Sequence, residues 1–289
     1  MAITAALVKQ LRDRTGLGMM DCKKALQETD GDLEKAIDEL RKSSALKAAK
    51  KAGRTTADGL LAIKVAADGT RGAIIEVNIE TDFAAKNEKF IAFVNKVVDI
   101  AFAAEDTSLG AVLSPSLDAE RETLVQEIGE NITVRRIQVL DSAEGGISSY
   151  LHGDNRKGAL VQLSAQADEV GRDIAMHVTA INPMVVNSSD VPAEVLSKER
   201  EIYLTQAQDS GKPQEIVAKM VEGRIKKYLA EVSLVDQPFV KDPNQKISAL
   251  ANSAGVSVVG FERFEVGEGI EVEAADFAAE VAAQLGSSN

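Results

Sequence analysis

Residues 72–83 read GAIIEVNIETDF, and this stretch decides the fold because its pattern returns once in the chain. Residues 72–77 (GAIIEV) align with residues 158–163 (GALVQL), and the same spacing pairs Asp82 with Asp168. We interpret this repeat as an internal duplication that yields two related subdomains. The two copies differ one residue later, where Phe83 corresponds to Glu169. Only the first copy therefore presents an acidic residue followed by an aromatic one.

Working outward, each copy has the pattern of a β-hairpin followed by a helix. Apolar residues alternate along the expected strands, and a turn sequence separates the two strands of each pair. Helical spacing of apolar residues follows. The expected strands are 59–65 and 72–79 in the first copy and 147–152 and 158–164 in the second, with helices over 90–101 and 170–178. A further helix is expected over 117–129, with strands over 130–137 and 256–266.

The first 54 residues have the pattern of a small separate unit of three short helices. Thr4 is a candidate N-cap, and Leu33, Ile37 and Leu40 recur at helical spacing in the third helix. Six basic residues follow within 41–54. No aromatic residue lies among them to stack on bases, so we interpret this stretch as a solvated linker or helix face.

Two more helical regions lie towards the C-terminus. Helices are expected over 192–208 and 213–229, on either side of a Ser-Gly-Lys-Pro turn, as an αα-hairpin that projects from the body of the protein. The segment 273–285 has the pattern of a short amphipathic helix, with Phe277 and Val281 on its apolar side. We expect this segment either to serve a partner or to fold back.

Composition limits the class of protein. The chain has 289 residues, of which 45% are hydrophobic and 27% charged, and its formal net charge is −12. These values are typical of a globular protein of about two domains, and the acidity makes it a poor general ligand for nucleic acid. The one cysteine, Cys22, excludes an internal disulfide framework and fits a reducing compartment. No apolar run has the length of a signal peptide or a membrane span, so we expect a cytoplasmic protein without a membrane partner.

Residues for covalent catalysis are scarce. His152 and His177 are the two histidines, and the sequence has no HExxH pair, no GxSxG turn and no GxxxxGK[ST] loop. Pairs of carboxylates carry no information among 45 acidic residues. We therefore expect a protein that is not an enzyme and that needs no metal ion and no cofactor.

Three places along the chain are candidate contact surfaces. At the strand-to-helix junction, Thr81 or Asp82 could cap the next helix with Phe83 as a hydrophobic staple, or Phe83 could project as an aromatic anchor beside a fixed charge. Adjacent methionines in 17–20 (LGMM) cannot both face one small core, so at least one is expected at the surface. The turn of the second hairpin, 150–153 (YLHG), is either a contact or loop packing.

Several blocks of this sequence, in order, resemble the bacterial elongation factor Ts family over essentially the full length of the chain. The blocks are LRDRTGLGMMDCKKAL, IEVNIETDFAAKN, IGENITVRR, SSYLHG, IAMHV, SGKPQEIVAKMVEGR, SLVDQPFV and RFEVGEGIE. The resemblance implies an α+β fold with a three-helix domain of the ubiquitin-associated type, a two-part core with antiparallel sheets and an inserted coiled-coil-like αα-hairpin. The expected division is 1–54 for the three-helix domain and basic linker, 55–140 for the first core subdomain, 141–187 with 230–265 for the second, 188–229 for the hairpin and 266–289 for a C-terminal helical module.

The resemblance also implies a function and a partner. Members of the family bind elongation factor Tu in its GDP form, promote GDP release by disturbing the Mg²⁺ and phosphate site, and stay bound until GTP binds. Carried over residue by residue, the contacts near the partner's Mg²⁺ site fall on Thr81, Asp82, Phe83 and Ala84, with alanine where some relatives have valine. The remaining partner contacts fall on Leu17, Met19, Met20, Tyr150, His152, Gly153, Phe277 and Val281.

Two other kinds of function stay open from the residues alone. The N-terminal helices and the basic stretch could form a protein- or RNA-binding adaptor without exchange activity. The αα-hairpin could instead support a structural dimer. Within the family resemblance, a homodimer through the hairpin or a 2:2 complex with the partner also stays open.

Overall fold

Two three-stranded antiparallel sheets form the centre of the molecule, one from each copy of the repeat. The computed structural model describes residues 3–143, 145–208 and 213–271. The first sheet has the order β1 (Asp58–Val65), β2 (Arg71–Ile79), β3 (Ile132–Asp141), and the second has the order β4 (Ile147–Leu151), β5 (Lys157–Leu163), β6 (Val258–Glu265). All six expected strands are confirmed, with β3 extending four residues beyond the expected end at 137.

The sheets share irregularities as well as order. The register between β2 and β3 shifts at Glu76/Val77, and the register between β5 and β6 shifts at Gln162/Leu163. These positions are equivalent in the repeat, so both copies keep the same local break in the ladder. The shared irregularity supports the interpretation of the sequence repeat as a duplication.

The two sheets pack against each other where small residues allow close approach. A Cβ atom at Gly72 would lie 2.7 Å from Ile147 Cγ2, and one at the equivalent Gly158 would lie 3.0 Å from Ile63 Cδ1. Around them lies an apolar cluster to which both sheets contribute: Leu61, Ile74, Ile147, Leu160, Phe264 and Val266. A third apolar cluster therefore joins the two sheets, in addition to the core of each.

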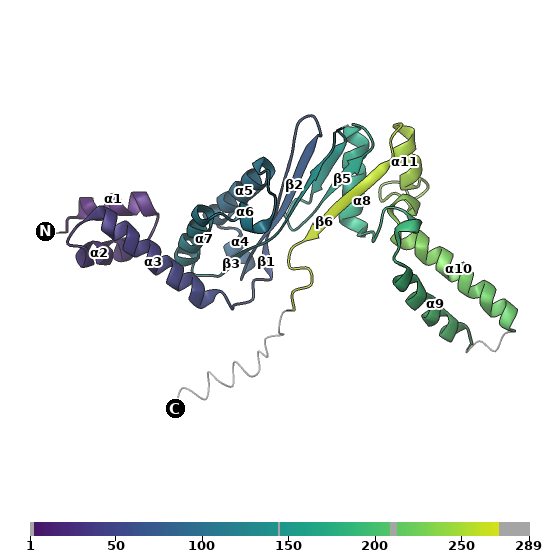
Figure 1. Ribbon diagram of the computed structural model, residues 1–289, viewed down its shortest axis with the longest axis horizontal. Coiled ribbons are helices and arrows are strands. Elements are labelled where there is room, and N and C mark those ends of the chain that lie inside the picture. Colours follow the sequence, from purple (N-terminus) through teal and green to yellow (C-terminus); the bar gives the residue numbers. More distant parts are fainter. Residues whose placement is uncertain (1–2, 144, 209–212, 272–289) are drawn as a thin grey trace, which may run out of the picture.

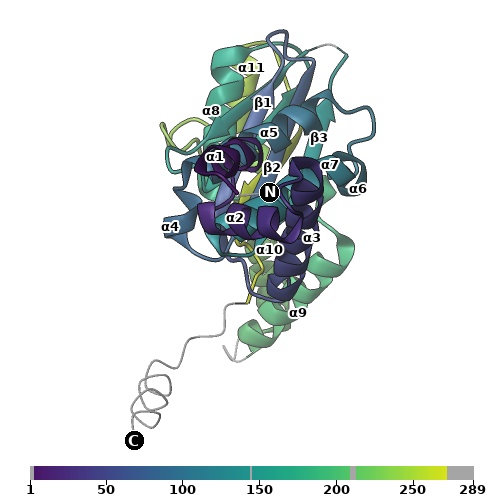
Figure 2. The ribbon, with the colours of Figure 1, turned by 90° about the vertical axis from the view of Figure 1, so that its left-hand side faces the viewer.

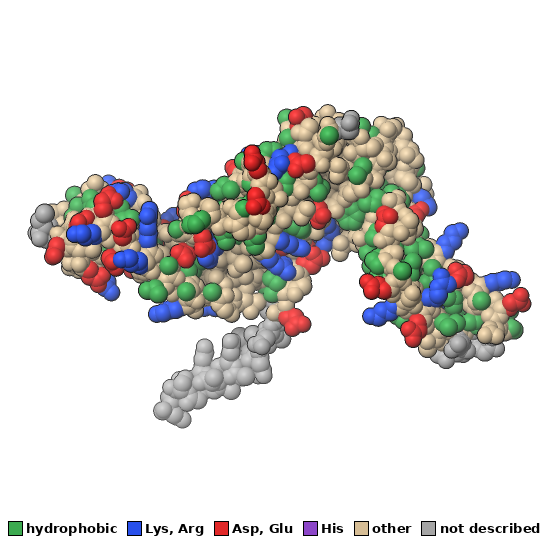
Figure 3. Space-filling model, viewed as in Figure 1, with side chains coloured by type: hydrophobic (Ala, Val, Ile, Leu, Met, Phe, Trp, Pro, Cys, Tyr) green, Lys and Arg blue, Asp and Glu red, His purple; other side chains and the backbone are tan. Residues whose placement is uncertain are grey.

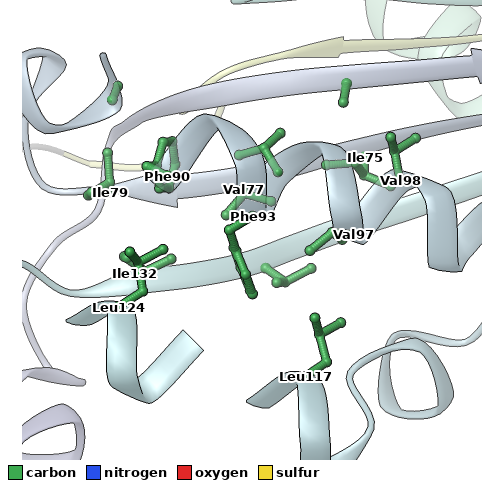
Figure 4. Packing of buried hydrophobic residues seen from close by; sticks show 14 of the residues in the cluster. Ile75, Val77, Ile79, Phe90, Phe93, Val97, Val98, Leu117, Leu124 and Ile132 are labelled. Atoms are coloured by element: carbon green, nitrogen blue, oxygen red, sulfur yellow. The ribbon is translucent and has the colours of Figure 1, made fainter. Parts of the chain in front are cut away.

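The first sheet is covered by the expected helices α5 (Glu88–Ala103) and α7 (Pro115–Ile128), with the short α6 (Leu109–Val112) between them. Figure 4 shows Phe90, Phe93 and Val97 of α5 facing Ile75 and Val77 of β2. Fully burying one such side chain stabilises the fold by about 1.5–3 kcal/mol. This packing fixes β2 and the junction that follows it.

The second sheet is covered by α8 (Asp168–Ile181), as expected, and by shorter elements between the hairpin and β6. These are the 3₁₀ turns η1 (Ser188–Asp190) and η2 (Leu234–Asp236) and the helix α11 (Ile247–Ser253). The sequence patterns did not predict them, because one or two turns are too short to show a helical period.

The N-terminal unit consists of α1 (Ala5–Thr15), α2 (Met19–Glu28) and α3 (Leu33–Lys51) around their own apolar cluster. Of the two alternatives for the basic stretch, the linker is wrong and the solvated helix face is confirmed, since Arg41, Lys42 and Lys50 are exposed on α3. Helix α3 continues through Lys51, and Ser44 and Ala48 are buried against α7 and the first core. Ser44 also donates a hydrogen bond of 2.7 Å to Gln126 Oε1. The stripe Leu40, Ser44, Ala48 recurs every four residues, so one face of the basic stretch is a packing face.

The helices expected over 192–208 and 213–229 are α9 (Ala193–Gln208) and α10 (Gln214–Val232). They lie side by side and extend away from the second sheet, at the opposite end of the molecule from α1 and α2 (Figure 1). Within the described residues, no helix combines the length and apolarity needed to cross a bilayer. The helix expected over 273–285, with Phe277 and Val281, lies outside the described residues.

Candidate partner-binding surface

Residues 81–84, called the tip below, follow directly from the central strand β2. The Thr81 side chain is the N-cap of the short helix α4 (Asp82–Ala85) and accepts a hydrogen bond of 3.2 Å from Ala84 N–H. Thr81 donates two hydrogen bonds to Glu130, from its N–H (3.0 Å) and its hydroxyl (2.8 Å). Ala84 and Ala85 are buried beneath the turn. The backbone of the tip is therefore held in place by its neighbours.

Phe83 lies on the outside of this held turn. Its side chain is 82% exposed, although Phe is among the more costly residues to leave in water. The hydrophobic-staple interpretation of Phe83 is therefore wrong, whereas the capping role of Thr81 is confirmed. Figure 2, viewed from the N-terminal end, shows α4 at the edge of the core. The tip thus combines a capped backbone with a projecting aromatic ring.

The charge beside the ring is paired. Asp82 Oδ2 lies 2.8 Å from Lys86 Nζ, and the same Nζ lies 5.4 Å from the centre of the Phe83 ring. The hydrogen bond from Lys86, aided by its charge, lowers the pKa of Asp82 below its ordinary value. Asp82 is therefore ionised but not a free negative charge.

The loop of residues 17–20 exposes two methionine side chains and buries the side chain of Leu17. Met19 is 60% and Met20 77% exposed at the start of α2, so both lie at the surface. Leu17 is only 2% exposed and packs in the cluster of the N-terminal unit. The expectation of Leu17 as a contact residue does not fit this burial, because its side chain is already taken up by the core. Its role here is to hold the loop that carries Met19 and Met20.

The turn of the second hairpin lies against the first sheet. Asn155 O accepts a hydrogen bond of 2.7 Å from Leu61 N–H, and Arg156 forms an ion pair with Asp58. The charge of Arg156 also contributes to the low pKa of Asp82, so this turn and the tip lie at the same end of the core. His152 is exposed at this turn, with Nδ1 3.0 Å from Asp154 Oδ1, and Gly153 is exposed beside it.

Tyr150 is half-buried and packs against the second core. Of the three residues expected in this hairpin, His152 and Gly153 are therefore open to a partner, and Tyr150 is largely committed to packing. This arrangement combines the two alternatives of contact and loop packing.

A buried ionic cluster behind the tip was not expected from the sequence. The Glu76 carboxylate on β2 is fully buried and pairs with Arg135 (3.1 Å) and Arg136 (2.5 Å) of β3. Asn78 Nδ2 (2.9 Å) and Gly267 N–H (2.8 Å) also donate to it. A signal was available: Glu76 interrupts the apolar run of residues 73–77, and a buried acid needs a cation.

The surroundings of Glu76 decide its ionisation. Burial alone would raise its pKa, but the hydrogen bonds from Gly267 and Asn78 and the charge of Arg136 outweigh burial and hold the pKa below its ordinary value. The cluster also involves Glu268, which pairs with Arg136 and with Arg263 of β6. It therefore ties β2 to the segment that follows β6.

The described residues offer no cluster of three or more His, Cys, Asp or Glu side chains placed to hold a metal ion. His177 is buried and fully hydrogen-bonded to Gln237 and to Val240 N–H, so it is part of the second core. What the surface offers is a set of exposed apolar side chains on fixed backbone, which suits contact with another protein.

Comparison with known proteins identifies the family. A family model described as "Elongation factor TS" matches residues 80–268. Elongation factor Ts of Saccharophagus degradans is 58% identical over 288 residues, covering 100% of this chain and 99% of that protein. Elongation factor Ts of Cellvibrio japonicus is 56% identical over 287 residues, covering 99% of this chain and 98% of that protein. The chain thus belongs to the elongation factor Ts family, and it is a translation elongation factor.

Proposed function

We propose that this chain binds elongation factor Tu in its GDP form and speeds GDP release, without covalent chemistry. The observation that carries this proposal is the tip, where Phe83 is 82% exposed on a backbone held by Glu130 and by the cap of α4. An exposed aromatic residue on a rigid support loses little freedom on binding and makes a strong anchor. A strained or mobile loop would lose part of that advantage.

The mechanism follows from how a guanine nucleotide is held. In a GTP-binding protein, Mg²⁺ bridges phosphate oxygens and backbone N–H groups surround them. Phe83 inserts between side chains of the partner and displaces the elements that hold the water ligands of the metal. Asp82 adds a carboxylate nearby. Once the metal is lost, the phosphate charge is less well neutralised, and GDP leaves faster.

Linkage then explains release of the factor. If this chain weakens nucleotide binding by the partner, nucleotide must weaken the binding of this chain by the same factor. The complex therefore persists while the nucleotide site is empty, and GTP binding expels the factor. Nothing in this cycle needs a metal ion or cofactor of the chain's own.

Other surfaces of the chain add to the area of contact with the partner. We propose Met19 and Met20 as adaptable contacts, His152 and Gly153 as contacts at the second hairpin, and Phe277 and Val281 as contacts of the C-terminal segment. The form of the N-terminal unit is proposed to be of the ubiquitin-associated type. The pair α9 and α10 is proposed as the site of a homodimer or of a 2:2 complex, since Ile202, Leu204 and Ile216 are exposed on it.

The test is release of a fluorescent GDP analogue from elongation factor Tu with and without the chain. A tip residue worth about 2 kcal/mol in the transition state changes the rate about 30-fold. We therefore expect Phe83→Ala to slow the stimulated release by about that factor, and Asp82→Ala to slow it less. Leu46→Ala, which removes a 65%-exposed apolar side chain from α3, is the matched control and should leave the rate unchanged.

Each result has a distinct meaning. If Phe83→Ala releases GDP as fast as the unmodified chain does, the wedge at the tip is wrong and the mechanism moves to other contacts. If the unmodified chain gives no acceleration, the exchange function itself is wrong, and an adaptor role would replace it.

A further inference from the structure

A groove lies between the N-terminal unit and the first core. It has a volume of about 770 Å³ and is lined by α1 and α3 on one side and by α5 and α7 on the other. Ile37, Leu40, Phe93 and Leu124 supply apolar lining. Its volume is that of a typical ligand-binding cleft, and its shape, between helices, suits an amphipathic segment. None of the contacts proposed above uses this groove.

The rim of the groove is predominantly cationic. It carries four basic residues, Arg14, Arg41, Lys89 and Lys96, against two acidic ones, Glu120 and Glu127. Three of the four are paired: Lys89 with Glu127 at 2.6 Å, Lys96 with Glu120, and Arg14 with Glu34 at 2.8 Å. Among the described residues, Arg41 has no ion-pair or hydrogen-bond partner. In Figure 3 acidic and basic side chains are intermixed over the visible surface of the N-terminal unit, so an excess of cations around an apolar groove is a local feature.

We propose that this groove is the docking site of the chain's own C-terminal segment, residues 272–289. The segment carries three acidic residues and no basic one, which complements the rim. Its larger apolar residues Phe277, Val281 and Leu285 recur every four residues, the spacing with which one face of a helix fills a groove. The charge of the segment therefore matches the rim of the groove, and its apolar spacing matches the apolar lining.

The C-terminal segment starts close enough to the groove to reach it. The last described residues follow Gly267, which is tied to Glu76, and Gly269 lies near Arg135. Figure 1 shows the chain leaving the core beside the C-terminal end of α3. Arg41 lies ten residues before Lys51, or about 15 Å along the helix axis. Leu285 is fourteen residues beyond Glu271, or about 21 Å along a helix axis, so a helical segment that runs back along α3 can reach the groove.

Tethering favours this occupant over others. A short linker gives the segment an effective concentration of the order of millimolar at the groove. Docking would cover Phe277 and Val281, so the segment must leave the groove before it contacts a partner. That last consequence rests on the proposed function, whereas docking itself is tested on the chain alone, and the two can fail separately.

The test uses the absence of tryptophan from the sequence. In a Phe277→Trp chain, the single tryptophan reports only on this segment. We expect its emission to be blue-shifted and protected from acrylamide relative to the same chain unfolded in urea. Arg41→Glu should lower the docking equilibrium constant about fivefold, the size of an exposed charge reversal, and expose the tryptophan accordingly. Lys219→Glu, an equal charge reversal on the exposed surface of α10 at the other end of the molecule, is the matched control.

Three outcomes overturn the proposal. A tryptophan as accessible as in urea means that the segment does not dock. Protection that is unaffected by Arg41→Glu, with circular dichroism unchanged, places the segment elsewhere. Protection that grows with protein concentration assigns the groove to a second copy of the chain.

Discussion

Lys86 sets the charge of the tip. It holds the Asp82 carboxylate at 2.8 Å and lies 5.4 Å from the Phe83 ring centre, so one cation contacts both residues proposed to act on the partner. With Lys86 in place, the negative charge of Asp82 and the positive charge of Lys86 cancel. Asp82 can therefore act as a negative charge towards a partner only after Lys86 has moved to another acceptor.

Removal of Lys86 tests this pairing directly. In Lys86→Met we expect the pKa of Asp82 to rise towards its ordinary value of 3.8, because the hydrogen bond that lowers it is lost. Side-chain carboxyl NMR titration measures the change, and Lys50→Met is a control on an exposed lysine in another element. An Asp82 pKa that does not move in Lys86→Met would contradict the pairing.

His177 makes the second core sensitive to pH. Its Nε2–H donates to Gln237 Oε1 at 2.8 Å, and its Nδ1 accepts from Val240 N–H at 3.2 Å, so only the neutral ring fits both partners. Burial lowers its pKa, and the bond to Gln237 only partly opposes this. Protonation in the folded state would break the bond from Val240.

The sign of the effect follows from linkage. The unfolded chain binds the proton near pH 6.5 and the folded chain only at lower pH, so stability is lost as pH falls below 6.5. Each unit of pKa depression contributes about 1.4 kcal/mol. Urea unfolding at about pH 8 and about pH 5.5 should show this loss, and the profile of His177→Gln should be flatter over the same window. Equal slopes for both chains would contradict the role of His177.

At the scale of elements, β2 joins the tip to the ionic cluster. Glu76 lies in the strand and the tip follows its end, while Gly267 N–H donates to Glu76 from a position 191 residues away in sequence. The same carboxylate thus fixes the strand that supports Phe83 and the point from which the C-terminal segment leaves. Two proposed contact regions share one buried anchor.

Glu76→Gln should destabilise the chain by about 2–4 kcal/mol at neutral pH, because it leaves Arg135 and Arg136 without their buried partner. The folded pKa of Glu76 is lowered, so its contribution is complete above 4.5 and is lost as pH falls through the folded value. Denaturant unfolding should therefore show a gap between the two chains that narrows below pH 4.5. A gap that stays constant with pH would exclude an electrostatic origin.

The sequence predicted local features of these elements and missed their long-range contacts. The alternation of apolar residues was sufficient to predict β2, and Thr81 was recognisable as a helix cap. Both signals lie within a few residues of sequence. Whether Phe83 would be buried could not be predicted, since that depends on which segments pack nearby. The hydrogen bond between Glu76 and Gly267 likewise depends on residues far apart in sequence. So does the position at which α3 ends, because its last turns pack against α7.

At the scale of the whole molecule, α3 is the connection between the N-terminal unit and the core. Its first half belongs to the cluster of the N-terminal unit, and Ala48 belongs to the cluster of the first core. Because this helix is continuous and buried at both ends, it fixes the distance from the two exposed methionines, Met19 and Met20, to the tip. The contacts proposed for these two regions are therefore held at a fixed separation.

Ala48→Glu should separate the two bodies without unfolding either. A carboxylate at this position, 4% exposed, cannot be buried without a partner, so the helix would move away from α7. Small-angle scattering should show a larger radius of gyration, and hydrogen exchange should increase on α7. Ala49→Glu, on the exposed face one residue later, should change neither. Unchanged scattering for Ala48→Glu would mean that other contacts hold the unit in place.

The central position of β2 also has a mechanical consequence. The strand is hydrogen-bonded to β1 on one side and to β3 on the other along its length, and the tip follows from its end. A pull or push on Phe83 along the strand axis therefore loads both ladders in shear, so that many hydrogen bonds resist together. The tip is therefore stiff along the axis of β2, and in the proposed wedge mechanism a stiff tip transmits a load along this axis to the partner with little deformation of its own.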